Sequence, residues 1–340
     1  MRLRDKDYIE TVEGLFFCVV GYLHPPDKYT AYLKYVPSKG GLWGRGSARY
    51  RRVLKRYHAL QVREAMWLLE EKYPHYVHYC PVRNIRISMV PVTRIKRAFR
   101  PRERLREIAK AEERDPLEEE VLELAILIRD AAGIGLDKLG VTGSVLIGIH
   151  RPEFSDIDLV VYSREAALKV IEALREPPPP IKEPPEEKKS EWVSNLIKFF
   201  GLSRRQAEEV ARRRWNYKVF RGRYFSVHPV REDHEIAEKY GEKTYQPLGM
   251  VEGTCTVVDA SESMFLPAVY RVSDVELKGG KHLDIREIVS YEGIFSSILR
   301  EGEKVYFKGK LEKVRTESET YYIVTIGTFE VPDNHVAPIV

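Results

Sequence analysis

The segment 115–162 constrains the possible fold more than any other part of this 340-residue chain. Asp115-Pro116 is typical of a helix start, with aspartate as the cap and proline in the first turn. A short strand near 138–142 then leads into Gly143-Ser144, and a second strand runs to Tyr162. A helix, a strand, a turn and a strand in this order predict a domain of mixed α+β class.

Two aspartates, Asp156 and Asp158, stand at the head of the second strand. Side chains two residues apart in a strand lie on the same face, so we expect these carboxylates to point the same way. Two such carboxylates repel each other unless a cation lies between them, and Mg²⁺ prefers oxygen ligands. Gly143 lets the backbone approach a phosphate, and the Ser144 hydroxyl can donate to it. The pattern predicts a site for a magnesium–nucleoside triphosphate, suited to attack on the α-phosphate with release of pyrophosphate.

The run Gly143-Ser144, Gly148 and Ser155-Asp156-Ile157-Asp158-Leu159 resembles the signature of the DNA polymerase β-like nucleotidyltransferase superfamily. That superfamily includes CCA-adding enzymes, poly(A) polymerases, oligoadenylate synthetases and antibiotic nucleotidyltransferases. The resemblance is close over about 20 residues and loose over 117–230. It implies that Gly143, Ser144 and Ser155 bind the nucleotide, and that Asp156 and Asp158 bind Mg²⁺, with a two-metal site as one form. The whole chain also resembles an uncharacterised archaeal group of predicted nucleotidyltransferases.

Members of the superfamily usually carry a third carboxylate on a neighbouring strand, as general base and metal ligand. The matching segment here is Phe225-Ser226-Val227-His228-Pro229, which has Ser226 at the aspartate position and His228 two residues later. Serine is a poor base, whereas histidine can act as a base near neutral pH. Three nearby acids, Glu232, Asp233 and Glu235, are alternative sources of the carboxylate, and the choice stays open.

Residues 1–100 form a predicted α/β N-terminal module. Strands are expected at 15–21, 29–36 and 84–92, and a helix at 57–71. The glycine-rich segment Lys39–Gly46 lacks the lysine and hydroxyl of a P-loop. We expect a mobile loop there, with four arginines available to an anionic substrate, namely Arg45, Arg49, Arg51 and Arg52. The basic segment 94–106 is either a solvated linker and helix start or a strip for nucleic-acid phosphates.

The remaining chain divides into a nucleotidyltransferase domain at 101–240 and a β-rich domain at 241–340. Within the first, we expect a helix at 164–175, an exposed connector at 176–190 and two short helices at 192–200 and 203–215. The β-rich part resembles a small OB-type barrel, a fold that binds nucleic acid through aromatic and basic side chains. Four residues would suit that role or, equally, would be ordinary core and surface residues, namely Tyr306, Lys308, Lys310 and Tyr322.

Composition indicates a cytoplasmic protein that is not a membrane protein. The three cysteines are odd in number and far apart, as in free thiols of a reducing compartment, and no apolar run nears 18 residues. No signal peptide is recognised. Glutamine occurs only three times and charged residues make up 31%, which is typical of a thermophile.

These features predict a Mg²⁺-dependent nucleotidyltransferase that moves NMP from a nucleoside triphosphate to a hydroxyl acceptor, for which RNA is one candidate. The alternative is a non-catalytic RNA- or nucleotide-binding protein on a reduced nucleotidyltransferase scaffold, because an aspartate is missing at Ser226. Neither the base preference, nor the acceptor, nor the oligomeric state follows from these patterns.

Overall fold

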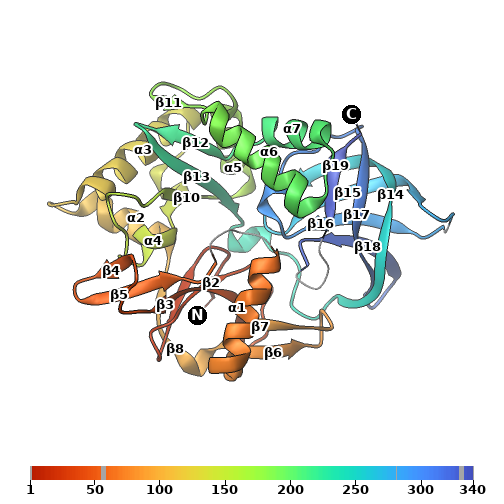
Figure 1. Ribbon diagram of the computed structural model, residues 1–340, viewed down its shortest axis with the longest axis horizontal. Helices are drawn as coiled ribbons and strands as arrows, with labels where there is room; N and C mark the ends of the chain where they lie inside the picture. Colours follow the sequence, from red (N-terminus) through yellow and green to blue (C-terminus); the bar gives the residue numbers. More distant parts are fainter. Residues whose placement is uncertain (1, 55–58, 281, 329–332, 340) are drawn as a thin grey trace. The chain divides into compact units, whose positions relative to one another are not determined.

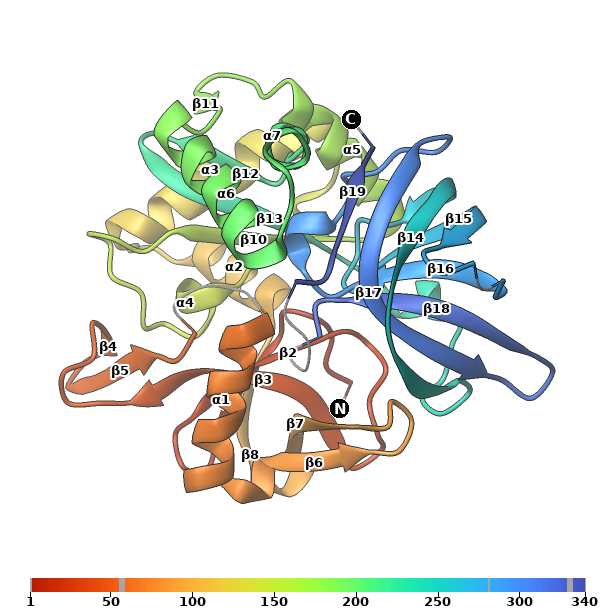
Figure 2. The same ribbon diagram turned by 45° about the vertical axis from the view of Figure 1, so that its right-hand side comes forward.

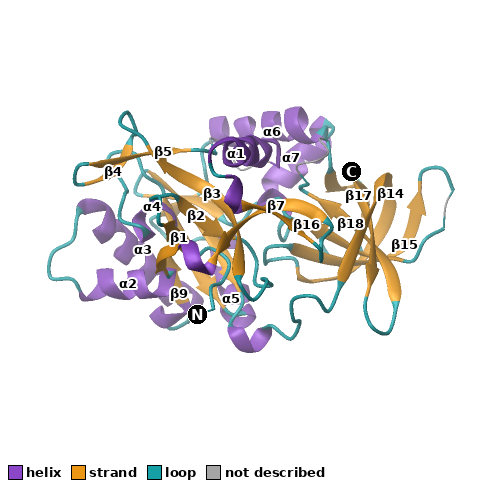
Figure 3. Cartoon of the chain, turned by 90° about the horizontal axis from the view of Figure 1, so that it is seen from below, coloured by secondary structure: helices purple, strands orange, loops and turns teal. Residues whose placement is uncertain are grey.

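The computed structural model describes residues 2–54, 59–280, 282–328 and 333–339 (Figure 1). The chain divides into two compact units, each assembled from three segments. Unit 1 contains 1–55, 88–184 and 215–237, and unit 2 contains 56–87, 185–214 and 238–340. Helices and strands occur in both units, which confirms the α+β class (Figure 3). The division into 1–100, 101–240 and 241–340 stays a prediction.

One sheet of unit 1 comes from the N-terminal segment. Six of its strands lie in the order β4-β5-β3-β2-β1-β8, and the end of β7 pairs with the start of β3. The bounds of these strands are β1 Tyr8–Thr11, β2 Phe16–Val19, β3 Lys28–Pro37, β4 Trp43–Arg45, β5 Ala48–Arg52, β7 Ile85–Pro91 and β8 Ile95–Phe99. The strands expected at 15–21, 29–36 and 84–92 are confirmed as β2, β3 and β7.

The expectation of a mobile loop over Lys39–Gly46 is wrong for Trp43–Arg45, which form β4 and pair with β5. The glycines of this segment serve the close approach of two backbones. A Cβ at Gly41 would lie 2.1 Å from the Tyr50 carbonyl oxygen, and one at Gly44 would lie 2.7 Å from that of Ala48. These glycines are therefore needed for the close packing of the hairpin. A rule that considers only local sequence interprets them as flexibility.

The second sheet of unit 1 has the order β11-β12-β13-β10-β9. Its strands β10 and β13 are parallel, and its other neighbours are antiparallel. The strand bounds are β9 Leu139–Val141, β10 Ile157–Tyr162, β11 Ile181–Lys182, β12 Tyr217–Phe220 and β13 Arg223–Val230. The helices of this unit are α2 Pro101–Lys110, α3 Pro116–Ala132, α4 Gly143–Leu146 and α5 Arg164–Arg175.

Local signals explain α3 and α5. The Asp115 side chain accepts hydrogen bonds from the N–H groups of Leu117 and Glu118, and Gly133 ends α3 with a left-handed φ of 60°. Helix α5 has the predicted bounds, and the Ser163 side chain caps it by accepting from the Ala166 N–H. The apolar stripe of α3 is buried, which anchors the helix in the core. It consists of Leu117, Val121, Leu124 and Ile128.

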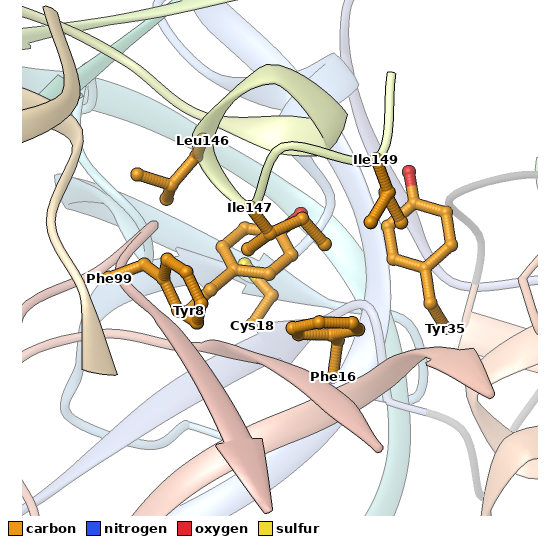
Figure 4. Packing of buried hydrophobic residues seen from close by; sticks show 8 residues of the cluster. All are labelled: Tyr8, Phe16, Cys18, Tyr35, Phe99, Leu146, Ile147 and Ile149. Atoms are coloured by element: carbon orange, nitrogen blue, oxygen red, sulfur yellow. The ribbon is translucent and has the colours of Figure 1, made fainter. Parts of the chain in front are cut away.

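An apolar cluster joins the first sheet of unit 1 to the segment that begins with α4 (Figure 4). Three aliphatic side chains of that segment, Leu146, Ile147 and Ile149, pack with side chains from β1, β2, β3 and β8. These partners are Tyr8, Phe16, Cys18, Tyr35 and Phe99. The cluster therefore fixes the chain that leads away from Gly143-Ser144.

The described residues of unit 2 form three α-helices and a closed ring of five strands, with a sixth strand, β19, added to β17. The ring runs β14-β15-β16-β18-β17 and closes through pairing of β17 with β14. The bounds are α1 Ala59–Lys72, α6 Glu186–Phe200, α7 Arg204–Arg212, β6 Val77–Cys80, β14 Thr244–Glu262, β15 Ala268–Leu277, β16 Ile285–Ser290, β17 Lys304–Arg315, β18 Thr320–Ile326 and β19 His335–Pro338. Five 3₁₀ turns complete the described elements, at Pro74–Tyr76, Val92–Arg94, Leu136–Lys138, Asp233–Glu235 and Gly293–Phe295.

Some element boundaries differ from those that the sequence predicts. Helix α6 begins at Glu186, so the exposed connector expected at 176–190 is wrong for its last five residues. The Ser203 cap of α7 is confirmed, because its side chain accepts from the Gln206 N–H. The three cysteines are buried and free, as predicted.

Candidate nucleotide and metal site

Parallel strands β10 and β13 place Asp158 directly opposite Ser226. Ser226 Oγ donates a hydrogen bond of 2.5 Å to Asp158 Oδ1 and lies 2.9 Å from His228 Nε2. His228 Nε2 is 4.0 Å from the same carboxylate oxygen. A carboxylate, a hydroxyl and an imidazole therefore share one small cluster, with about a third of the Asp158 and His228 side chains exposed.

The glycine turn lies against the same carboxylate. Gly143 has a left-handed φ of 69°, and a Cβ there would lie 2.4 Å from Asp158 Oδ2. The Thr142 N–H also donates to the Asp158 carbonyl oxygen, at 2.8 Å. Two independent constraints, conformation and space, thus require glycine at this position. The structure brings together the two parts of the motif that the sequence separates by 15 positions.

The charge of Asp158 is stabilised by its neighbours. Burial raises the pKa of the Asp158 carboxyl, but the nearby His228 imidazole, the positive charge of Lys34 and the hydrogen bond from Ser226 outweigh it, so the pKa lies well below its usual range. Burial lowers the pKa of His228 despite the nearby Asp158 carboxylate. At neutral pH we therefore expect an ionised Asp158 beside a neutral imidazole.

The remaining predicted residues lie around this cluster in different environments. Asp158 is the second residue of β10, whereas Asp156 precedes the strand and is exposed. Ser144 is buried in α4. The Ser155 hydroxyl accepts from the Arg151 N–H at 3.0 Å, a bond that closes the loop 151–155. Nucleotide contacts of Ser144 and Ser155 stay predictions.

The three alternative carboxylates are engaged elsewhere. Glu232 pairs with Arg102 at 2.5 Å and with Arg4 at 3.3 Å, and Asp233 pairs with Arg4 at 3.0 Å. Glu235 accepts the N–H groups of Arg164 and Glu232, at 2.8 Å each. Among the residues that the structure describes, Asp156 and Asp158 belong to no group of three metal-ligating side chains with donor atoms within 4.8 Å of one another.

A different group, Asp115, Glu118 and His150, does meet that distance. Its donor atoms already have partners in the cap of α3. Asp115 Oδ2 lies 2.6 Å from His150 Nε2, Asp115 Oδ1 accepts from the Leu117 N–H, and Arg104 donates to Glu118. The hydrogen bonds of this cap explain why the three side chains lie close together, without a bound cation.

Sequence reasoning missed the contribution of the N-terminal segment. The Lys6 carbonyl oxygen accepts from Thr142 Oγ1 at 2.8 Å, beside the glycine turn. Asp5 is buried, and its Oδ2 lies 3.8 Å from Lys6 Nζ. Lys34 of β3 is also buried, with its ammonium 5.4 Å from the centre of the Tyr8 ring. Residues that contact each other but lie more than a hundred positions apart along the chain leave no local signal in a single sequence.

In the described residues, no helix has both the length and the apolar character needed to cross a membrane. No family model and no solved structure matches the chain. A protein of Methanocaldococcus jannaschii, named uncharacterized protein MJ1086, is 31% identical over 341 residues, which cover 96% of each chain. The chain belongs to the family of this archaeal protein.

Proposed function

We propose that the chain is a Mg²⁺-dependent nucleotidyltransferase, with a polymerase β-like core formed by the elements from α3 to β13. It moves NMP from a nucleoside triphosphate to a hydroxyl acceptor. The observation that carries the proposal is the contact between Gly143 and the Asp158 carboxylate. Attack on an α-phosphate needs a phosphate-binding turn and a metal-binding carboxylate side by side, and this contact joins the two.

The donor chemistry fits Mg²⁺, because Asp156 and Asp158 offer carboxylate oxygens that solvent can reach. These two residues would hold the ion, and Gly143 would let the backbone approach the phosphates. Bound Mg²⁺ would supply charge neutralisation at the triphosphate. The site suits one ion better than two, because Ser226 replaces the third carboxylate expected opposite Asp158.

His228 is the residue best placed to accept the proton of the attacking hydroxyl. The Ser226 hydroxyl uses its proton in the bond to Asp158, so His228 Nε2 must donate to Ser226 Oγ. Nδ1 of the neutral imidazole is then the nitrogen that can accept a proton. In this role His228 replaces the usual third carboxylate as the base.

A second candidate function is nucleotide or RNA binding without transfer. Ser226 favours it, because a hydroxyl occupies the place where the superfamily carries a catalytic carboxylate. Serine neither binds Mg²⁺ well nor acts as a base. The two functions differ in one outcome, which is whether a bound nucleoside triphosphate is consumed.

The barrel of unit 2 supports RNA as the acceptor only by analogy of fold. Its strand order, with β16 and β18 as the parallel pair, is similar to that of OB-type barrels. Lys310 is not available to a ligand as the sequence suggested, because it is buried and pairs with Glu312 at 3.0 Å. Tyr306 donates its hydroxyl to Glu252 at 2.8 Å.

Incubation with each α-labelled nucleoside triphosphate, Mg²⁺ and total RNA of the source cell tests the proposal. We expect label from one nucleotide to enter RNA, and Asp158→Asn to abolish it. Glu153→Gln is the matched control, an exposed acid of the same loop whose ion-pair partner among the described residues is Arg151. Saturable binding with every nucleotide left intact would favour the second function instead.

A further inference from the structure

The part of the chain around the β4–β5 hairpin is basic and lacks acids. The 36 positions 28–63 contain ten lysines and arginines and no aspartate or glutamate. They are Lys28, Lys34, Lys39, Arg45, Arg49, Arg51, Arg52, Lys55, Arg56 and Arg63. In a chain whose net charge is only +5, this is a marked local excess of positive charge.

The hairpin presents part of this charge to solvent. It forms the edge of its sheet and projects from β3 (Figure 2). The Tyr50 ring packs 5.1 Å from that of Phe16, so Arg49 and Arg51, its neighbours in β5, point to the opposite face. Arg51 and Lys39 are exposed. Arg49 Nη1 donates to the carbonyl oxygens of Gly46 and Ala48 in the hairpin, at 2.8 and 3.1 Å.

Within the described ranges, no carboxylate pairs with Lys39, Arg49 or Arg51. The other basic segment, 94–106, differs in this respect. Most of its cations have a carboxylate partner, which favours the structural interpretation of that segment. These pairs are Arg94–Glu13, Lys96–Glu10, Arg100–Glu103, Arg102–Glu232 and Arg104–Glu118. Unpaired cations gain more from a bound phosphate, because no existing ion pair has to be broken.

The base of the hairpin is attached to the loop that leads into the candidate site. The Gly44 N–H donates to the Ile149 carbonyl oxygen at 3.0 Å. The Trp43 ring packs edge-on against Phe154, with ring centres 5.7 Å apart, and Phe154 stays 46% exposed. Ile149 and Phe154 lie between the glycine turn and Asp156. The hairpin therefore contacts the loop that leads along the chain to the two aspartates.

We propose that the β4–β5 hairpin binds the phosphates of a single-stranded RNA and holds its 3′ end toward Asp156 and Asp158. Arginine guanidinium groups match phosphate geometry, and an exposed aromatic ring such as Phe154 offers a face on which a base can stack. Single strands combine both features and provide a free hydroxyl. The role of the bound end rests on the proposed transferase function, whereas the binding itself does not.

Fluorescence anisotropy with a labelled, unstructured single-stranded RNA tests this surface. The full-length Asp158→Asn chain is used without nucleotide, so the result is independent of transfer. Adding Arg49→Gln and Arg51→Gln should weaken binding by about tenfold or more. The slope of log K against log salt should become less steep by about 1.4. Adding Arg94→Gln and Lys96→Gln instead is the control, and should leave the affinity within about twofold, because those cations already have carboxylate partners.

Circular dichroism melts verify that both double variants fold, and Lys39→Gln provides a milder test of the same surface. Equal affinity and salt slope in the hairpin variant and its parent would overturn the proposal. Absence of RNA binding would overturn it too, as would preferential binding to phosphatidylserine vesicles. Absence of RNA binding in a wild-type chain that still transfers NMP to a small hydroxyl acceptor would contradict the hairpin role alone.

Discussion

Ser226 Oγ donates a 2.5 Å hydrogen bond to Asp158 Oδ1 across the parallel strand pair β10–β13. The serine stands where the resemblance places a third carboxylate, and it stabilises the charge of Asp158 without adding charge of its own. His228 approaches the same hydroxyl. Under the proposed function, this relationship determines how many metal ions the site would hold and which group would act as the base.

Ser226→Asp should convert the site into a stronger metal site. In EDTA the variant should unfold more easily than the wild type, by about 1–2 kcal/mol, because two carboxylates then face each other. Mg²⁺ should restore this stability and bind about tenfold more tightly than to the wild type, which corresponds to about 1.4 kcal/mol. Thermal melts over a Mg²⁺ titration measure both effects.

Ser226→Ala is the control for that series, because it removes the hydroxyl without adding charge. It should cost about 1 kcal/mol of stability through loss of the hydrogen bond, with no gain in Mg²⁺ affinity. If Ser226→Asp and Ser226→Ala respond equally to Mg²⁺, the two positions do not share a metal site.

Gly143→Ala should impair the site more than backbone strain alone predicts. The new Cβ would lie 2.4 Å from Asp158 Oδ2 in addition to the strain of a left-handed φ. Gly133→Ala is the matched control, since φ is 60° there and, apart from its neighbours along the chain, no described atom lies within 4 Å of the new Cβ. We expect a cost of about 1 kcal/mol at Gly133 and about 2–4 kcal/mol at Gly143 in urea denaturation. Equal costs would show that Gly143 does not pack against Asp158.

Local patterns sufficed for the elements that surround the site. Asp115, the stripe that begins at Leu117 and the glycine at 133 defined α3, and α5 has its predicted bounds. The β4–β5 hairpin was missed because its glycines serve a contact across the hairpin, which a local rule interprets as flexibility. The partners of segment 94–106 were also unpredictable, since Arg94 and Arg102 pair with acids 81 and 130 positions away.

Asp7 should make stability depend on pH. Burial raises the pKa of this carboxyl from 3.8 to about 7, although the Arg4 N–H and the charge of Arg100 oppose the change. Folding therefore favours the protonated form of Asp7. The stability that this carboxyl contributes is complete below pH 4 and is lost as pH rises through 7. Relative to Asp7→Asn, the wild type should lose about 2–4 kcal/mol of unfolding free energy between pH 4 and 8. Urea denaturation at a series of pH values measures the difference, and parallel curves for both proteins would refute it.

Asp115→Ala should destabilise the protein through the cap of α3 rather than through a metal. Losing the bonds to the N–H groups of Leu117 and Glu118 should cost about 1–2 kcal/mol. EDTA should leave the melting temperature of both proteins unchanged. A wild type that loses stability in EDTA, beside an unaffected variant, would instead indicate a cation held by Asp115, Glu118 and His150.

Site prediction from the sequence was strongest within the short segment 143–158. Asp158 and Gly143 meet as expected, because strand and turn are both local features. The resemblance implied that Ser226 lies on a strand next to Asp158, but the contribution of Lys34 could not be foreseen, since it reaches Asp158 through packing. A serine at 226 is visible in the sequence, but its hydrogen bond to Asp158 becomes evident only in the fold.

Mg²⁺-dependent release of pyrophosphate tests the central claim most directly. The wild type and Glu153→Gln should release pyrophosphate from one nucleoside triphosphate in the presence of an RNA acceptor, at equal rates. Asp156→Asn and Asp158→Asn should each reduce that rate by about a hundredfold or more while melting within a few degrees of the wild type. Release by the Asp156→Asn, Asp158→Asn double variant at the wild-type rate would contradict the assignment of this site.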